Sequence, residues 1–163
     1  SFTFNFSSGK PLRWYNANWY VYWDDTSAQD DGNWHHWMVY DSPSELSGSK
    51  LYVDGTLIPI NEIISSSEAG AANYNQPLTI GSYRNDGLAA GAHFSGSIKE
   101  FSVFPGDKTS NASKYYNNGT PYDVSNEDEL QAYWKISESS GSIAYDYSGN
   151  GNNGTLDGAT WNS

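Results

Sequence analysis

The stretch KLYVDGTLI, residues 50–58, has the pattern of a β-hairpin. Asp54 and Gly55 separate two apolar runs, and Asp-Gly is a preferred pair for the two-residue turn of a β-hairpin because both turn positions need a positive φ. The sequence therefore predicts a pair of antiparallel strands on either side of this turn.

Period-two alternation continues outward from the hairpin and predicts strands, because successive side chains of a strand point to opposite faces. In WHHWMVYD, residues 34–41, His35, Trp37 and Val39 alternate with Trp34, His36, Met38 and Tyr40. Further strands are predicted in SFTFNF (1–6), WYVYWDD (19–25), LTIGS (78–82), SIKEFSVF (97–104) and LQAYWKIS (130–137). Residues 65–76 are predicted to form a surface loop and NASKYYNNG (111–119) a short helix, so about ten short strands should pack as two antiparallel sheets.

The composition favours an all-β domain and excludes several classes of function. The 163 residues fit one domain, 16% of them are aromatic, and there is no cysteine for a disulfide or a thiolate metal site. A net charge of −11 repels phosphate backbones and anionic lipid surfaces, so nucleic acid is not an expected partner. No apolar run has the length of a membrane span, and membrane insertion is not expected.

Five blocks, taken in order, resemble the second half of a laminin-G-like domain of the concanavalin A-like lectin/glucanase superfamily. They are GNWHHWMVYD, SKLYVDGTLI, LTIGS, FSGSIKEFSVF and YYNNGTPYD, and the resemblance spans roughly Trp34 to Tyr122. It implies a two-sheet antiparallel jelly-roll sandwich over residues 1–163. It also implies an extracellular or particle-surface location and recognition of glycans or proteins, often beside a calcium ion.

The closing segment, residues 130–163, is predicted to be a strand, a loop and a strand that belong to the sandwich. It is similar to a segment that often opens domains of this family and that follows the jelly roll in some viral and bacterial surface proteins. Family members usually carry strands before the point where Ser1 begins, so we expect the chain to be part of a longer polypeptide. Either the closing segment folds back to supply the missing strands or a neighbouring chain supplies them. The first alternative is favoured.

Within this segment, DYSGNGNNGTLD (residues 146–157) has the spacing of a calcium loop. Oxygen-bearing side chains stand at alternate positions, glycine is sixth and aspartate is twelfth. The candidate ligands are Asp146, Ser148, Asn150 and Asp157. The alternative interpretation is an Asn-Gly-rich loop that joins two strands, since Gly and Asn accept positive φ.

Carbohydrate recognition is predicted at two groups of residues. The chain has more large aromatic rings near its N-terminus than one core layer can hold, so some should reach the surface and stack on sugars. The candidates are Trp14, Trp19 and Trp23, with packing between sheets as the alternative for each ring. Arg84, Asn85 and Asp86 would supply hydrogen bonds from a hairpin tip, with a solvated turn as the alternative.

No catalytic arrangement emerges from the sequence. Adjacent His35 and His36 in a strand point to opposite faces and cannot share a metal, so they are interpreted as packing and hydrogen-bonding residues. Glycosidases need two carboxylates across a cleft, whereas SIKEFSVF offers Glu100 alone. The chain is therefore predicted to be a non-catalytic module that binds carbohydrate or a glycosylated surface within a larger assembly. The alternative is a structural surface or decoration domain, of a viral particle or a cell-surface appendage, that packs against copies of itself.

Overall fold

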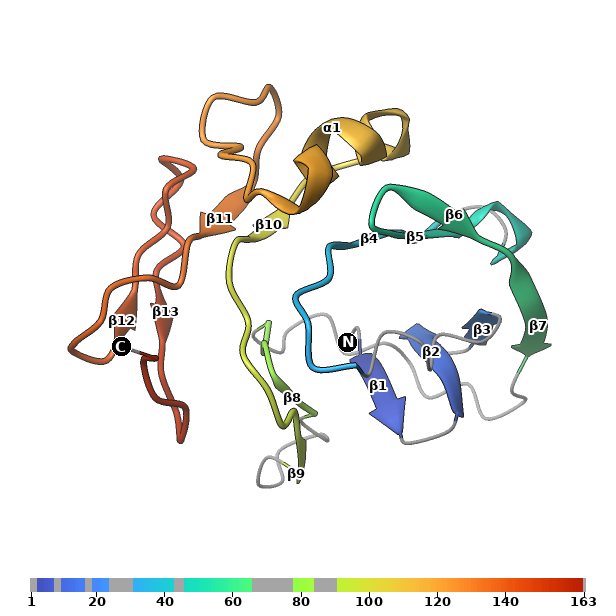
Figure 1. Cartoon of the computed structure of the whole chain (residues 1–163), viewed down its shortest axis with the longest axis horizontal. Helices are drawn as coiled ribbons and strands as arrows, with labels where there is room; N and C mark the ends of the chain where they lie inside the picture. The colour runs from blue at the N-terminus through green and yellow to red at the C-terminus, as the bar shows by residue number, and fades with distance from the viewer. Residues whose placement is uncertain are drawn as a thin grey trace. The chain divides into compact units, whose positions relative to one another are not determined.

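A computed structural model describes residues 3–7, 10–16, 19–23, 31–42, 46–65, 78–83 and 91–162. The chain divides into two compact units, unit 1 (Ser1–Ser95) and unit 2 (Gly96–Ser163), whose elements are labelled in Figure 1. Each unit is described by itself.

The predicted hairpin is confirmed in unit 1. Strands β4 (Trp37–Tyr40), β5 (Lys50–Val53) and β6 (Thr56–Ile58) form a three-stranded antiparallel sheet, with a short 3-10 turn η2 (Leu46–Gly48) before β5. Asp54 and Gly55 form the turn between β5 and β6 with φ values of 50° and 74°. Both residues are in the left-handed region, which is what a two-residue hairpin turn requires.

One face of this sheet forms the described core of unit 1. Leu51 and Val53 are buried, and partly buried apolar side chains pack against them: Trp37, Val39, Ile58 and Ile60. The register pairs Trp37 with Val53 and Val39 with Leu51, so the predicted alternation of β4 is confirmed at these positions. Cross-strand apolar pairs of this kind are the main stabilising contacts within a sheet.

A second sheet of unit 1 has the order β1-β2-β3-β7. Its strands are β1 (Thr3–Ser7), β2 (Lys10–Asn16), β3 (Trp19–Trp23) and β7 (Ile60–Ser65), all paired antiparallel. Pro59 alone separates β6 from β7. Proline has no N–H to donate to a ladder, which suits the point where the chain leaves one sheet and enters the other.

The prediction of a strand at LTIGS, residues 78–82, is wrong in its position. The strand β8 is only Ser82–Tyr83 and pairs with β9 (Gly91–His93). Thr79 donates its hydroxyl to the Ser82 carbonyl at 3.2 Å, and Gly81 has a φ of 80°. This local bond and the left-handed glycine turn the chain where alternation alone predicted an extended strand.

In unit 2 the strand predicted at SIKEFSVF is also shorter than expected. Strand β10 (Phe101–Val103) pairs antiparallel with β11 (Ala132–Trp134), which lies inside the predicted LQAYWKIS strand. Glu100 has a φ of 55°, so the extended conformation ends immediately before Phe101. The pairing of β10 with β11 joins the closing segment to the rest of unit 2.

The short helix predicted near residue 111 is confirmed. Helix α1 (Ala112–Tyr116) lies between the 3-10 turns η3 (Thr109–Asn111) and η4 (Asn117–Gly119). Tyr115 is buried, and its ring stacks on Phe104 at a centroid distance of 5.8 Å and contacts Tyr122 at the same distance. Aromatic contacts therefore fix this helix to the chain on both sides of it.

The closing segment continues into a small hairpin of β12 (Ile143–Ala144) and β13 (Gly154–Thr155). Its anchor is β11, where all three residues are buried. Every sheet is antiparallel and helix is confined to short segments in the residues that the structure describes, so the protein is an all-β, antiparallel chain. No described helix is long and apolar enough to cross a membrane.

Candidate functional site

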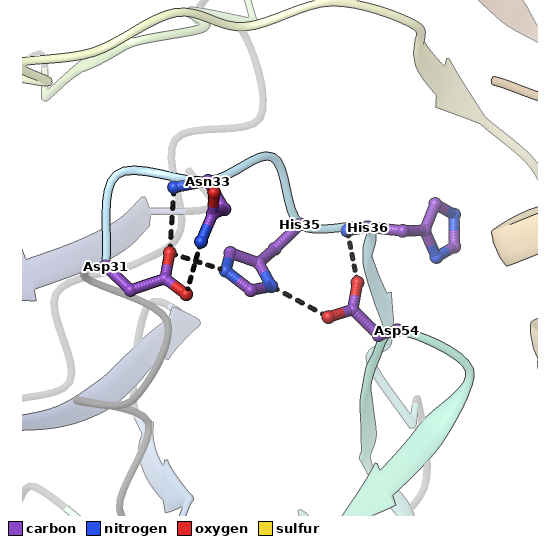
Figure 2. A network of polar contacts seen from close by, with 5 residues as sticks. All are labelled: Asp31, Asn33, His35, His36 and Asp54. Carbon is purple, nitrogen blue, oxygen red and sulfur yellow. Dashed lines mark hydrogen bonds and ion pairs between the residues drawn. The ribbon is translucent and has the colours of Figure 1, made fainter. Parts of the chain in front are cut away.

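A cluster of polar side chains lies between the start of β4 and the turn of the β5–β6 hairpin. It consists of Asp31, Asn33, His35 and Asp54, and we call it the His35 cluster (Figure 2). The Asp54 backbone N–H donates to the His36 carbonyl at 2.9 Å, and the His36 N–H donates to Oδ1 of Asp54 at 2.9 Å. The turn residue Asp54 thus replaces a backbone carbonyl as the partner of His36, and β4 begins only at Trp37.

The imidazole of His35 is held between two carboxylates. Its Nδ1 lies 2.7 Å from Oδ2 of Asp54 and its Nε2 lies 3.1 Å from Oδ1 of Asp31. The hydrogen bond with Asp54 raises the pKa of His35 above the usual 6.5, and Asp31 adds to this effect against the opposing effect of burial. Both ring nitrogens donate when His35 is protonated, so the interpretation of this residue as a hydrogen-bonding group is confirmed.

The pKa of the neighbouring histidine, His36, is shifted in the opposite direction. Burial lowers the pKa of His36 below 6.5, and the nearby charge of Asp54 only partly offsets this. Asp31 has its pKa lowered to about 2, first by hydrogen bonds from Asn33, whose side chain and backbone donate at 2.9 and 2.8 Å, and then by His35. The cluster therefore carries two carboxylates and one readily protonated imidazole.

We expect the two histidines to titrate on opposite sides of pH 6.5. A raised folded-state pKa means that the His35 contribution to stability is complete below pH 6.5 and is lost as the pH rises through the folded value. NMR titration of the ring protons should give His35 the higher pKa and His36 the lower one. Asp54→Asn should bring the pKa of His35 down. Equal values for the two rings would show that the cluster does not form.

Trp34 lies directly before His35 in the chain and has 58% of its surface exposed. The carboxylates of the cluster keep part of their acceptor capacity, since a carboxylate has about four lone-pair sites and Asp54 uses two of them in the bonds described above. An exposed indole ring can stack on a flat apolar face, and the carboxylates of the cluster that follows it in the chain can accept hydrogen bonds from hydroxyl groups.

The residues that the sequence singled out for carbohydrate binding are placed only in part. Trp14 lies in β2, and Trp19 and Trp23 lie in β3, but their side chains are outside the part of the chain that the structure describes. Arg84, Asn85 and Asp86 lie wholly outside the described residues. Their roles in binding stay predictions.

Three of the four predicted calcium ligands lie together. Ser148 donates its hydroxyl to Oδ2 of Asp146 at 2.9 Å, and the side chain of Asn150 donates to the Ser148 hydroxyl at 3.2 Å. Asp157 follows β13 and is exposed. Among the described residues, no group of three or more acidic or histidine side chains could hold a metal ion. Calcium binding by this loop stays a prediction.

The Asp146 carboxylate is engaged by donors from its own unit. Its Oδ1 accepts the N–H groups of Tyr133 and Ser148 at 3.0 and 2.9 Å, and its Oδ2 accepts the Asn152 N–H at 2.8 Å besides the Ser148 hydroxyl. Burial alone would raise the pKa of Asp146, but these hydrogen bonds outweigh it and lower the pKa to about 2. Asp146 thus ties the Asn-Gly loop to strand β11.

Comparison with known proteins identifies the family. Residues 1–112 match a laminin-G family model described as the concanavalin A-like lectin/glucanases superfamily. This match begins before Trp34 and ends before Tyr122, so it covers an N-terminal part that the five sequence blocks did not include. No curated protein matches the chain, and no solved structure matches it. The match covers more than half of the sequence, and the chain belongs to the laminin-G branch of the concanavalin A-like lectin/glucanase superfamily.

Proposed function

We propose that this protein is a non-catalytic recognition module that binds carbohydrate or a glycosylated surface, in a two-sheet jelly-roll sandwich. The observation that carries the proposal is the exposed Trp34, which directly precedes His35 of the cluster in the chain. The family adds support, since its members include lectins and carbohydrate- or protein-binding modules of the extracellular space. We accordingly place the protein outside the cell or on the surface of a particle.

The charge of the site favours a neutral sugar. The cluster has two carboxylates, Asp31 and Asp54, around one imidazole, and the protein as a whole carries −11. A sulfated or carboxylated glycan would meet repulsion at this site, whereas hydroxyl groups of a neutral sugar can donate to the carboxylates. Neutral oligosaccharides should therefore bind more tightly than anionic ones.

Trp34→Ala should weaken binding to a neutral glycan by about 1–3 kcal/mol, the usual effect of removing an aromatic anchor. The fold should remain intact because the ring is mostly exposed. Leu57→Ala is a matched control, since Leu57 is 52% exposed and lies in β6, directly after the Asp54-Gly55 turn. A glycan array, with and without a chelator, finds the ligand, and calorimetry measures both variants. Equal glycan affinities of the two variants would show that Trp34 is not part of the binding site.

A structural role in self-association is the second candidate, favoured by exposed apolar side chains in unit 2. Ile143, Tyr145 and Tyr147 stand at alternate positions and are 42%, 51% and 43% exposed. Contiguous exposed apolar surface often marks an interface. Sedimentation equilibrium distinguishes the candidates, because self-association at micromolar concentration together with an empty glycan array would support the structural role.

A further inference from the structure

The chain contains three Asn-Gly pairs, all of them in unit 2: Asn118-Gly119, Asn150-Gly151 and Asn153-Gly154. Asn-Gly is the dipeptide most prone to spontaneous loss of the side-chain amide, because glycine places no side chain in the way of its own backbone nitrogen. That nitrogen must reach the side-chain carbonyl carbon of the asparagine. The reaction therefore depends on whether the folded chain lets the side chain and backbone rotate.

Two of the three pairs are held by the loop that Asp146 organises. The Asn150 side-chain amide donates to the carbonyls of Leu130 and Gln131, each at 3.0 Å, and to the Ser148 hydroxyl. The Asn153 side-chain oxygen accepts the backbone N–H of Asp146 at 2.9 Å. Both amides must break these bonds before they can turn toward the following glycine.

Asn118 stands on a different kind of structure. It lies in η4 after the end of α1, and Asn118 and both of its neighbours in the chain are exposed. Asn117, Asn118 and Gly119 have φ values of 47°, 52° and 80°, so two consecutive non-glycine residues occupy the left-handed region. Asparagine adopts this conformation more readily than other residues with a side chain, so Asn117 and Asn118 suit a left-handed corner. An exposed corner of this kind opens more easily than a loop whose asparagine side chains are held by hydrogen bonds.

We propose that Asn118 is a site of spontaneous deamidation in the folded protein, and that Asn150 and Asn153 are protected by their hydrogen bonds. The Gly119 nitrogen forms a bond to the Asn118 side-chain carbonyl carbon, the bond to the amide nitrogen breaks, and ammonia leaves with the proton from Gly119. Water then opens the cyclic imide at either carbonyl. The product is aspartate or isoaspartate, with one more negative charge than the asparagine.

Peptide mapping by mass spectrometry tests the proposal on the full chain. The protein is incubated at mildly alkaline pH, and conversion at the three Asn-Gly pairs is followed in the same sample, with isoaspartate methyltransferase as the probe for the rearranged product. Conversion at Asn118 should run at least several-fold ahead of the other two. In denaturant the three rates should become similar, because the local sequence is then the only determinant.

Two variants make the test specific. Asn118→Gln should remove the early product, since the longer side chain cyclises far more slowly. Asp146→Ala should raise conversion at Asn150 and Asn153 toward the rate at Asn118, because the loop loses the acceptor that organises it. Equal rates at all three pairs in the native wild-type protein, or faster conversion at Asn150 or Asn153, would overturn the proposal whether or not the Asp146 variant folds.

Discussion

Trp134→Ala should destabilise unit 2 by about 3–5 kcal/mol, the usual cost of truncating a buried tryptophan. Trp134 lies at the end of β11, where it is 8% exposed and pairs with Phe101 of β10. The two rings lie 6.0 Å apart, and the indole N–H donates to the Asn152 carbonyl at 2.8 Å. The truncation therefore removes apolar burial, an aromatic contact and the bond that ties the Asn-Gly loop to β11 at once.

Trp134→Phe separates these contributions, because it keeps a ring against Phe101 but loses the N–H donor. Its cost should be nearer to the roughly 1 kcal/mol of one hydrogen bond, with some loss of packing. Hydrogen exchange of the β10 and β11 amides reports on unit 2 alone and is the appropriate measurement. If both variants kept the protection of the wild type, Trp134 would not belong to the core.

The features that depend on neighbouring residues could be predicted from the sequence. The Asp54-Gly55 turn needs only two residues that accept positive φ, and the alternation of Trp37 and Val39 needs only the pleat of a strand. The short helix near Tyr115 followed from its local composition and the Gly-Thr-Pro break after it. The ends of strands were less predictable, because single residues such as Glu100 and Gly81 adopt positive φ for reasons that alternation does not reveal.

The sequence alone did not predict the His35 cluster, because that requires the register between β4 and β5. A two-residue turn at Asp54-Gly55 fixes β5 against β6, but the pairing of Trp37 with Val53 is a contact across the intervening chain. Once that pairing is known, Asp54 must lie opposite His36 and within reach of His35. Asp31 is four residues from His35, but that spacing brings side chains together on a helix and residues 31–36 are not helical, so spacing alone did not predict this contact.

The second large effect is expected at Asp146. Asp146→Ala should cost about 2–3 kcal/mol, since hydrogen bonds to a charged group contribute more than neutral ones and several N–H groups lose their acceptor. Asp157→Ala is the matched control, because Asp157 is an exposed aspartate that follows β13 in the same segment, and its loss should change stability by less than about 0.5 kcal/mol. Hydrogen exchange of the Tyr133 amide, followed at increasing urea concentration, gives the free energy of unfolding of both variants.

The pH dependence of these variants distinguishes a structural Asp146 from a calcium ligand. The folded-state pKa of about 2 lies below the usual 3.8, so the contribution of Asp146 is complete above pH 3.8 and is lost as the pH falls toward 2. The wild type and Asp157→Ala should lose stability over this acid range, and Asp146→Ala should lose less. Calcium binding by the predicted set would instead raise the melting temperature of the wild type in millimolar calcium, and both substitutions would diminish that rise. A melting temperature indifferent to calcium, with an acid-induced loss of stability that is smaller only in Asp146→Ala, would assign the loop to structure alone.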